Sequence, residues 1–335
     1  MTNRKKFLKH LAATAAASFA APWATLDSDH KKHALTSLSE IDGTPEEIAR
    51  SEDYWRYVQQ AYTVDRSTIY LNSAGVNPAS RMVQESVKRY SDEINQVPSQ
   101  MLGLGTEGIL KPQIETVRQK LANVFGVHKE EIAIVRNATE GLVNCELGFE
   151  LTAGDEVLAS HQIYGSMANA LERRVRVEGI KLTRLSLPVP AENEDEIVQL
   201  YEEKITPRTK LIMLDHMSNK GQLFPVKKIV NMARTYDVSV IVDGAQTFGH
   251  LDFKQQDLGC DYFATSLHKW LSAPLGTGML YIKKDKINSI RSLFPGYRPR
   301  PDNIRKFEAI GTHPIGHYLA ISDAIEFYRG IGAKR

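Results

Sequence analysis

Cysteine is scarce in this sequence, with only Cys145 and Cys260 among 335 residues. The two residues lie far apart, and neither has a Cys or His partner at the spacing of a zinc site. This scarcity argues against a disulfide framework and against a structural zinc. Apolar residues flank both cysteines, so we expect each thiol to fill space in a hydrophobic core.

A strong net charge and a long hydrophobic run are also missing. The formal net charge is +2, with 24% charged and 42% apolar residues. This balance is typical of a globular protein, whereas a partner such as nucleic acid or an anionic membrane surface selects a larger basic excess. No run of ~20 apolar residues follows the N-terminal region, so we expect no membrane span. The length allows roughly two domains, or one large α/β domain with an appendage.

Acidic side chains are absent from the first 26 residues, which are basic between residues 4 and 9 and then rich in alanine. We interpret residues 1–26 as a signal-like leader. Its basic part resembles a twin-arginine export signal, with Lys5 where the second arginine would stand, and this resemblance implies an exported or periplasmic protein. The alternative is a plain basic, alanine-rich helix on a cytoplasmic protein.

Short apolar runs rich in β-branched residues alternate with longer amphipathic stretches from about Tyr54 onward. This pattern predicts an α/β fold with a mostly parallel central sheet flanked by helices. The clearest unit is a strand at 211–214, a helix at 226–233 with apolar residues at helical spacing, and a strand at 238–242. Further strands are predicted at 132–135, 156–159, part of 62–71, 262–264 and 278–282.

Chemically matched residues follow three of these strands. Asp243 follows one strand, residues 266–269 follow a second, and residues 137–139 follow a third. Open α/β sheets bind ligands at the carboxyl ends of their strands. Lys269 stands between a histidine and a tryptophan, where desolvation would lower its pKa and make a neutral nucleophile available. An amine, an acid and anion donors are what pyridoxal 5′-phosphate (PLP) requires of a protein.

The segments 243–246 (Asp-Gly-Ala-Gln) and 266–278 resemble the signature of class V aminotransferase-fold enzymes. Three further segments match in the right order, at 70–75 (Tyr-Leu-Asn-Ser-Ala-Gly), 137–141 (Asn-Ala-Thr-Glu-Gly) and 216–219 (His-Met-Ser-Asn). That family includes cysteine desulfurases and isopenicillin N epimerase, and the His-Lys-Trp-Leu tetrapeptide is closer to the epimerase-like branch. The resemblance implies the PLP-dependent transferase fold of type I.

The resemblance implies a cofactor site around PLP. Lys269 would be the catalytic residue and would hold PLP as a Schiff base, and Asp243 would pair with the pyridinium nitrogen. Gln246 would contact the phenolic oxygen, Asn219 would lie near the same edge, and Tyr164 would stack on the ring. Taken alone, Asp243 could be a turn residue at a strand end and Tyr164 ordinary half-buried packing.

The resemblance also implies a phosphate site. Ala138 and Thr139 would offer backbone amides and a hydroxyl at a helix N-terminus, which is physically suited to anions. Ser266 and His268 would complete this cup. Thr277 would reach the phosphate of a partner subunit, which implies a homodimer with a shared active site. Taken alone, Thr139 could simply be a helix N-cap.

Three other patterns are not interpreted as sites. Residues 103–108 satisfy G-x-G-x-x-G but follow no predicted strand, so no dinucleotide site is predicted. His313 and His317 have i, i+4 spacing, but Pro314 lies between them and disfavours a helix, so no metal site is predicted. The charged cluster at 172–176 is interpreted as the solvated face of a helix.

The predicted domains are a linker at 27–50, a large PLP-binding α/β domain at 51–295 and the start of a small C-terminal domain at 296–335. This small domain looks truncated, because the chain ends soon after a helix predicted at 321–329. The arginine that grips the substrate carboxylate in the family, and any desulfurase cysteine, would lie beyond residue 335.

Several reactions at the α-carbon of an amino acid fit one such site. We expect an aminotransferase-like or epimerase-like enzyme in which Lys269 carries the proton at the α-carbon. The alternative is a cysteine desulfurase or selenocysteine lyase, although Cys145 and Cys260 do not occupy the desulfurase position. A further alternative is a PLP-fold protein that binds or regulates without turnover, and the pairing of Lys269 with Asp243 argues against it.

Overall fold

The computed structural model describes residues 43–103, 108–296 and 300–332. The predicted leader therefore lies outside the described residues, as do residues 104–107 of the glycine motif. Helix α3 (Pro45–Ala49) lies within the range predicted to be a linker. Its N-cap, Thr44, forms a capping box with the first turn, a local signal that the polar composition of this stretch conceals.

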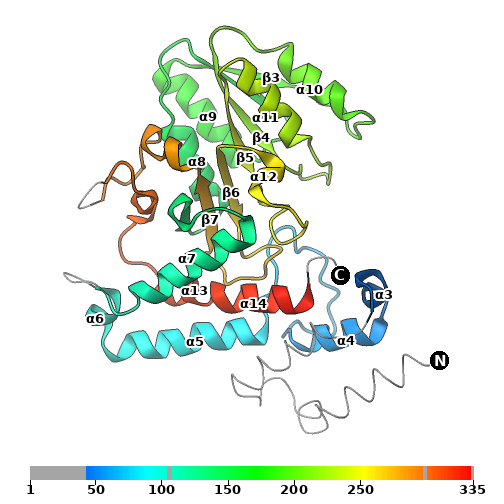
Figure 1. The fold of residues 1–335 in the computed structure, drawn as a ribbon, viewed down its shortest axis with the longest axis vertical. Helices are drawn as coiled ribbons and strands as arrows, with labels where there is room; N and C mark the ends of the chain where they lie inside the picture. The colour runs from blue at the N-terminus through cyan, green and yellow to red at the C-terminus, as the bar shows by residue number, and fades with distance from the viewer. Residues whose placement is uncertain (1–42, 104–107, 297–299, 333–335) are drawn as a thin grey trace.

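A seven-stranded sheet with the order β1-β7-β6-β5-β4-β2-β3 forms the centre of the molecule (Figure 1). Strand β7 is antiparallel to both of its neighbours, and all other pairs are parallel, which confirms the predicted mostly parallel sheet. Apolar, β-branched runs form these strands because helices bury both faces of the sheet. The strands are β1 (Ile132–Val135), β2 (Glu156–Ser160), β3 (Lys181–Leu185), β4 (Thr209–Asp215), β5 (Ser239–Asp243), β6 (Tyr262–Ser266) and β7 (Gly278–Ile282).

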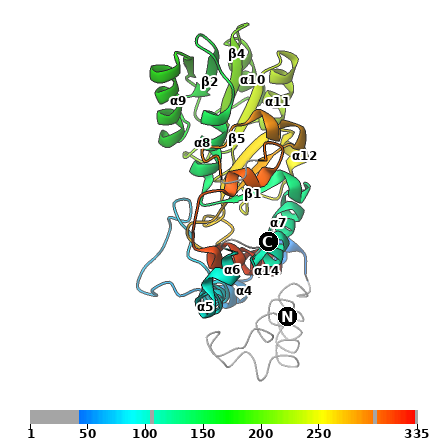
Figure 2. The ribbon, with the colours of Figure 1, turned by 90° about the vertical axis from the view of Figure 1, so that its left-hand side faces the viewer.

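Helices cover the two faces of the sheet in separate layers (Figure 2). Alternate residues of each strand point to opposite faces, so the core divides into two apolar clusters. One face is covered by α8 (Ala138–Gly148) and α9 (Gly165–Glu178). The other is covered by α7 (Lys111–Phe125), α10 (Glu194–Glu202), α11 (Val226–Thr235) and α12 (Gln255–Leu258).

The two ends of the described chain pack together below the sheet in the view of Figure 1. Helix α5 (Arg81–Gln96) contacts α13 (Ile315–Leu319) and α14 (Ile321–Ile331), which also contact α7. Helix α14 confirms the helix predicted at 321–329. Among the described helices, none is long and apolar enough to cross a membrane. The remaining elements are α4 (Glu52–Gln60), α6 (Pro98–Leu102), η2 (Lys129–Glu131), η3 (Lys284–Ser289) and η4 (Ile304–Glu308).

The strand predicted within 62–71 is wrong. This segment is irregular apart from an isolated bridge between Tyr62 and Ser80. Ile69 and Leu71 suggested a strand because they are apolar and, for Ile69, β-branched. They are 85% and 88% exposed and do not pair with the sheet. Strand β3 escaped prediction because it is a half-exposed edge strand with two basic residues.

Of two further predictions, the one for the charged cluster is wrong in part and the one for the cysteines is confirmed. The cluster at 172–176 is not solvated throughout, because Arg174 is fully buried, donates to the carbonyl oxygens of Glu146 and Phe149, and pairs with Glu178. Cys145 and Cys260 are fully buried, which confirms the prediction that both thiols fill space in the core.

Candidate active site

The predicted site residues gather at one edge of the sheet, where the parallel strands have their carboxyl ends. Because β7 is antiparallel, its first residue, Gly278, also lies at this edge. The topology thus assembles residues that are distant in sequence. Ala138 follows β1, Tyr164 follows β2, Asn219 follows β4, Asp243 ends β5, and Ser266 ends β6.

The amino terminus of α8 is the anion-binding part of this edge. Asn137 caps the helix by accepting a hydrogen bond at Oδ1 from the first turn at 2.8 Å, so the helix begins at Ala138. The backbone N of Ala138 donates to Ser266 Oγ at 2.9 Å. Gly278 permits this close packing, since a Cβ there would lie 2.6 Å from the Cα of Asn137. The first-turn amides, including that of Thr139, and the helix dipole favour a bound anion.

Lys269 lies in a loop, 266–273, that is braced from several sides. Ser272 N donates to Lys269 O at 3.0 Å, and Ser272 has a φ of 56°. A non-glycine residue in this region costs of order 1–3 kcal/mol. The amide of Asn77 donates to the Ser272 hydroxyl, and Asn77 N donates to His268 O at 2.9 Å. The loop therefore holds Lys269 in one place at the end of the sheet.

Lys269 and Asp243 influence each other's ionisation. Burial lowers the pKa of Lys269, and the charge of Asp243 opposes that shift. Burial raises the pKa of Asp243, while a hydrogen bond from Ala245 N to its Oδ1 at 2.8 Å and the charge of Lys269 lower it. The lysine is thus closer to its neutral, nucleophilic form, and the carboxyl group has the support that a charge-pairing role requires.

Two more buried carboxyl groups lie near Asp243 and were missed in the sequence. Asp215 ends β4 in register with Asp243, and Glu146 lies on α8, fully buried, with no hydrogen-bond partner for either oxygen among the described residues. Burial, and then the charge of Asp243, raises the pKa of both groups well above the usual range. Asp243, by contrast, has a backbone donor and the charge of Lys269 to support its charged form. Asp215 could have been found in the sequence because it stands at the carboxyl end of a predicted strand. No pattern in the sequence points to Glu146.

Gln246 links the site to the 70–75 motif. Its Nε2 donates to Ala74 O at 3.1 Å, and its Oε1 accepts from Trp270 Nε1 at 3.0 Å. Trp270 in turn stacks on His250, with ring centroids 3.8 Å apart and planes within 8°. One amide hydrogen of Gln246 is left for a ligand, which is compatible with the predicted contact to a phenolic oxygen.

Tyr164 and Asn219 are exposed at this edge. Tyr164 is 57% exposed and stands at the N-cap of α9, and Asn219 lies in the turn after β4. His268 is half-buried, burial lowers its pKa, and its Nδ1 lies 3.2 Å from Thr277 O. Tyr164 and Asn219 are thus open to a ligand.

Thr277 lies in the turn between the lysine loop and β7. Its side chain is fully buried, and its hydroxyl donates to Pro274 O at 2.6 Å. Its carbonyl oxygen accepts from Leu267 N at 3.0 Å and so supports the lysine loop. The contact of Thr277 with the phosphate of a partner subunit stays a prediction. Leu275, 60% exposed, is the residue of this turn that reaches the surface.

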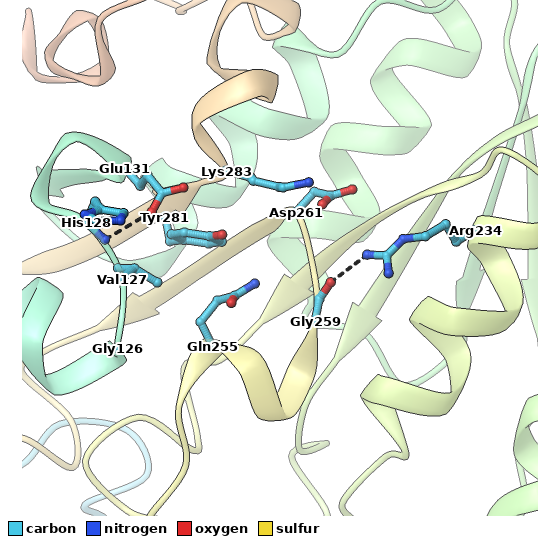
Figure 3. A pocket seen from close by; sticks show the side chains of 10 residues that line it. All are labelled: Gly126, Val127, His128, Glu131, Arg234, Gln255, Gly259, Asp261, Tyr281 and Lys283. Carbon is cyan, nitrogen blue, oxygen red and sulfur yellow. Dashed lines mark hydrogen bonds between the residues drawn. The ribbon is translucent and has the colours of Figure 1, made fainter.

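A hollow of ≈ 400 Å³ lies at the opposite edge of the sheet (Figure 3). Its lining includes Glu131, which precedes β1, Asp261, which precedes β6, and Lys283, which follows β7. None of the predicted site residues lines it. Ligands of open α/β sheets bind at the carboxyl edge, so this hollow is not the candidate site.

His313 and His317, which have i, i+4 spacing, do not share a helix. Pro314 caps α13, so His317 lies in that helix and His313 lies before it. His313 packs against Tyr318, and His317 Nδ1 lies 2.9 Å from Leu275 O. No group of His, Cys, Asp and Glu that could hold a metal ion occurs in the part of the chain that the structure describes.

Residues 69–335 match the family model of class V aminotransferases. This chain belongs to that family. Isopenicillin N epimerase of Amycolatopsis lactamdurans is 32% identical over 300 residues, covering 84% of this chain and 74% of that protein. A probable cysteine desulfurase of Halalkalibacterium halodurans is 29% identical over 287 residues, covering 79% and 67%.

Solved structures show the same fold. The cystine C–S lyase C-DES in complex with cysteine persulfide superposes with a TM-score of 0.73 at 24% identity, covering 79% of this chain and 73% of that one. A variant of that lyase with glycine covalently linked to its PLP cofactor gives 0.74 at 23%, covering 81% and 76%. These likenesses confirm the predicted type I fold.

Class V aminotransferase-family enzymes depend on PLP, and the residues at this edge fit that cofactor. The half-buried amine of Lys269 would bind it, and Asp243 would pair with its ring nitrogen. The start of α8, with Ser266 and His268 near it, would hold its phosphate. The chain therefore is a PLP-dependent enzyme of the class V aminotransferase family.

Proposed function

We propose that this enzyme acts at the α-carbon of an amino acid in an epimerase-like or aminotransferase-like reaction. One observation carries the proposal. Lys269 is held in a braced loop, close enough to Asp243 for their charges to interact, and burial lowers its pKa. A lysine whose pKa is lowered by burial is more readily neutral, and a neutral amine can accept a proton and return it. The 32% identity to an isopenicillin N epimerase supports the epimerase-like branch.

Each part of the edge has a distinct task in this proposal. PLP, when bound, withdraws electrons from the α-carbon and so makes its proton acidic. Lys269 removes that proton or returns it. Asp243 holds a negative charge against the ring nitrogen, and the first turn of α8 with Ser266 orients the phosphate. Tyr164, exposed at the same edge, would cover the ring.

A second candidate is cysteine desulfuration or another lyase reaction at carbon–sulfur bonds, which the cystine C–S lyase and desulfurase likenesses favour. A desulfurase needs an accessible cysteine thiolate. Cys145 and Cys260 are fully buried, and burial raises the pKa of both thiols. We rank this candidate second, because the identity to the probable cysteine desulfurase is 29%, against 32% to the isopenicillin N epimerase. A PLP-fold protein without turnover ranks third, because the Lys269 and Asp243 pair is complete.

The test is to load the purified chain with PLP and incubate it with amino acids in deuterated water. We expect exchange of the α-hydrogen, followed by an epimerised product or a keto acid, measured by NMR and chiral chromatography. Lys269→Ala should lower the exchange rate by about 10²–10⁴-fold. Lys210→Ala, which replaces an exposed lysine on β4, should leave the rate unchanged. Sulfide released from cysteine would favour the second candidate. Bound PLP without exchange of any substrate would favour the third.

We also propose that the enzyme is a homodimer whose two subunits share each active site. Ile69 and Leu71 are almost fully exposed, in the segment that Gln246 and Asn77 join to the site, and Leu275 is exposed as well. Exposed apolar side chains that border a site mark a contact surface. Sedimentation equilibrium should give twice the chain mass for the wild type and a lower mass for Leu71→Lys. A monomeric wild type that binds PLP fully would contradict the proposal.

Residues 1–26 are proposed to be a twin-arginine-like export signal, on the basic and alanine-rich pattern of the sequence. Fractionation of the host cell should find the chain in the exported fraction without Met1, and Arg4→Gln should retain it in the cytoplasm. Wild-type protein that stays in the cytoplasm with Met1 intact would instead support a cytoplasmic enzyme.

A further inference from the structure

Trp270 follows Lys269 directly and contacts the turn after β5 at two places. Its Nε1 donates to Gln246 Oε1 at 3.0 Å, and its ring stacks on His250 with centroids 3.8 Å apart. His250 Nδ1 lies 3.1 Å from Gln246 O, and because a carbonyl oxygen only accepts, this nitrogen is the donor. The indole, the imidazole and the glutamine therefore form one closed set of contacts beside the lysine.

The side-chain amide of Gln246 has a single orientation that suits both of its partners. An indole N–H only donates, so the amide atom that faces Trp270 must be the oxygen. A backbone carbonyl oxygen only accepts, so the amide atom 3.1 Å from Ala74 O must be the nitrogen. Turning the amide by 180° would set donor against donor and acceptor against acceptor. The second hydrogen of Nε2 is thus kept as a donor for a ligand.

Both partners of this amide are tied to the lysine loop. The indole belongs to the loop itself. The segment of Ala74 is joined to the loop because Asn77 N donates to His268 O at 2.9 Å. The turn after β5 also packs closely on the loop, since a Cβ at Gly249 would lie 2.8 Å from Leu271 N. The same contacts that place the lysine therefore orient the amide.

We infer that Trp270 is a positioning residue for the phenolic oxygen of PLP: its indole N–H holds the Gln246 amide so that the nitrogen is the donor to that oxygen. The inference rests on the predicted contact of Gln246 with PLP and not on the reaction that follows. A hydrogen bond donated to the phenolic oxygen stabilises its charged form and so lowers the pKa of the lysine-bound cofactor. Trp270 acts on PLP only through Gln246.

The test follows the visible absorbance band of the lysine-bound cofactor as the pH is changed. Gln246→Leu removes the donor and should raise the midpoint of this titration by about one pH unit, the equivalent of one ordinary hydrogen bond. Trp270→Phe keeps an aromatic ring beside His250 but has no N–H, so the amide loses one of its two fixed partners. We expect about a third to a half of the same upward shift.

Trp55→Phe is the matched control for the loss of an indole N–H. Trp55 Nε1 donates to Ala49 O at 2.7 Å, in a separate apolar cluster, so this variant should leave the midpoint unchanged. Trp270→Phe made in the Gln246→Leu background should also add no shift, because a residue that acts only through Gln246 then has nothing to position.

Three results would overturn the inference. The first is a titration of Trp270→Phe that matches the wild type, and the second is an equal shift from Trp270→Phe with and without Gln246. The third is an unchanged midpoint for Gln246→Leu, which would show that the predicted contact of Gln246 with PLP is itself wrong. Failure of PLP binding as such would appear separately, as a wild type without the visible band.

NMR of protein labelled with ¹⁵N at the tryptophan indoles keeps the inference testable if Trp270→Phe fails to fold. In the PLP-loaded enzyme the indole signal of Trp270 should move when Gln246→Leu removes its acceptor. The signal of Trp55, identified with Trp55→Phe, should stay in place. A Trp270 signal that does not respond to Gln246→Leu would show that the indole does not hold this amide, against the inference.

Discussion

Buried carboxyl groups have many polar partners at one edge of the sheet and few at the other. Glu156, at the amino edge where β2 begins, is almost fully buried and is held by Lys181 Nζ at 2.7 Å and by three threonine hydroxyls. Burial alone would raise its pKa, but these partners lower it to about 2. This carboxylate is fully compensated and is part of the structure.

At the carboxyl edge the compensation is incomplete. Asp243 has one backbone donor and the charge of Lys269, Asp215 has no hydrogen bond among the described residues, and burial raises the pKa of both. A group left short of partners in the free protein is available to a ligand. The difference between the edges therefore separates Glu156, which stabilises the fold, from Asp243, the proposed partner of the PLP ring nitrogen.

The largest effect is expected at Lys269. Lys269→Ala should lower the rate of α-proton exchange by about 10²–10⁴-fold, the usual contribution of a positioned acid or base. It should also remove the visible absorbance band of the lysine-bound cofactor. The variant should melt no lower than the wild type, because it removes an amine whose burial is unfavourable. A large fall in melting temperature would show that Lys269, like Glu156, stabilises the fold.

The two edges are compared most directly by replacing one carboxylate at each edge with the matching amide and measuring stability. Glu156→Gln should lower the free energy of unfolding at pH 7 by about 1–3 kcal/mol, because hydrogen bonds to a buried charge are lost. Asp243→Asn, measured without PLP, should lower it by less than about 1 kcal/mol or raise it. Urea unfolding measures both values.

The pH dependence adds a check on Glu156. Its pKa in the folded protein lies below the usual 4.5, so its stabilisation is present above that pH and is lost as the pH falls toward about 2. The gap between wild type and Glu156→Gln should close over that range. Equal losses for Glu156→Gln and Asp243→Asn at pH 7 would break the comparison between the edges.

His216, just after β4, should make the carboxyl edge sensitive to acid. Burial lowers its pKa from 6.5 to about 4, and its Nδ1 has no hydrogen-bond partner among the described residues. The unfolded chain takes up a proton first as the pH falls below 6.5, so stability decreases. Between pH 7 and 5 the wild type should lose about 2 kcal/mol more than His216→Asn. Parallel pH profiles of unfolding for the two proteins would show that this imidazole is not the cause.

The smallest effect is expected at the cap of α8. Asn137→Ala should cost about 1 kcal/mol of stability, the usual value of an N-cap, and should also weaken PLP binding. Asn193→Ala, which removes the similar cap of α10, should cost the same stability and leave PLP binding unchanged. Equal PLP affinities for the two variants would show that the N-terminus of α8 does not bind the phosphate.

Much of the fold was predictable because its signals are local. The unit at 211–242 forms β4, α11 and β5 as predicted, since apolar spacing within one element reflects the face that the element buries. The prediction of a strand within 62–71 was wrong because pairing between strands is not a local property. The residues there have β character, but a strand needs a neighbour to pair with, and the sheet offers none to this segment.

The site was predictable where it follows strand ends and unpredictable where it depends on packing. Asp243, Ser266 and Lys269 stand at strand ends in the sequence, and the topology brings them to one edge. The burial of Thr277, by contrast, depends on how its turn folds against the lysine loop. No local pattern in the sequence shows that packing.

By itself, the sequence determined most strands of the sheet, the family motifs and the residues that stand where parallel strands end. Only the tertiary structure decided which carboxyl groups are compensated, as at Glu156, and which are not, as at Asp215 and Glu146. The physical reason is that hydrophobic periodicity belongs to a single element, whereas desolvation and charge pairing depend on every element that packs around a group.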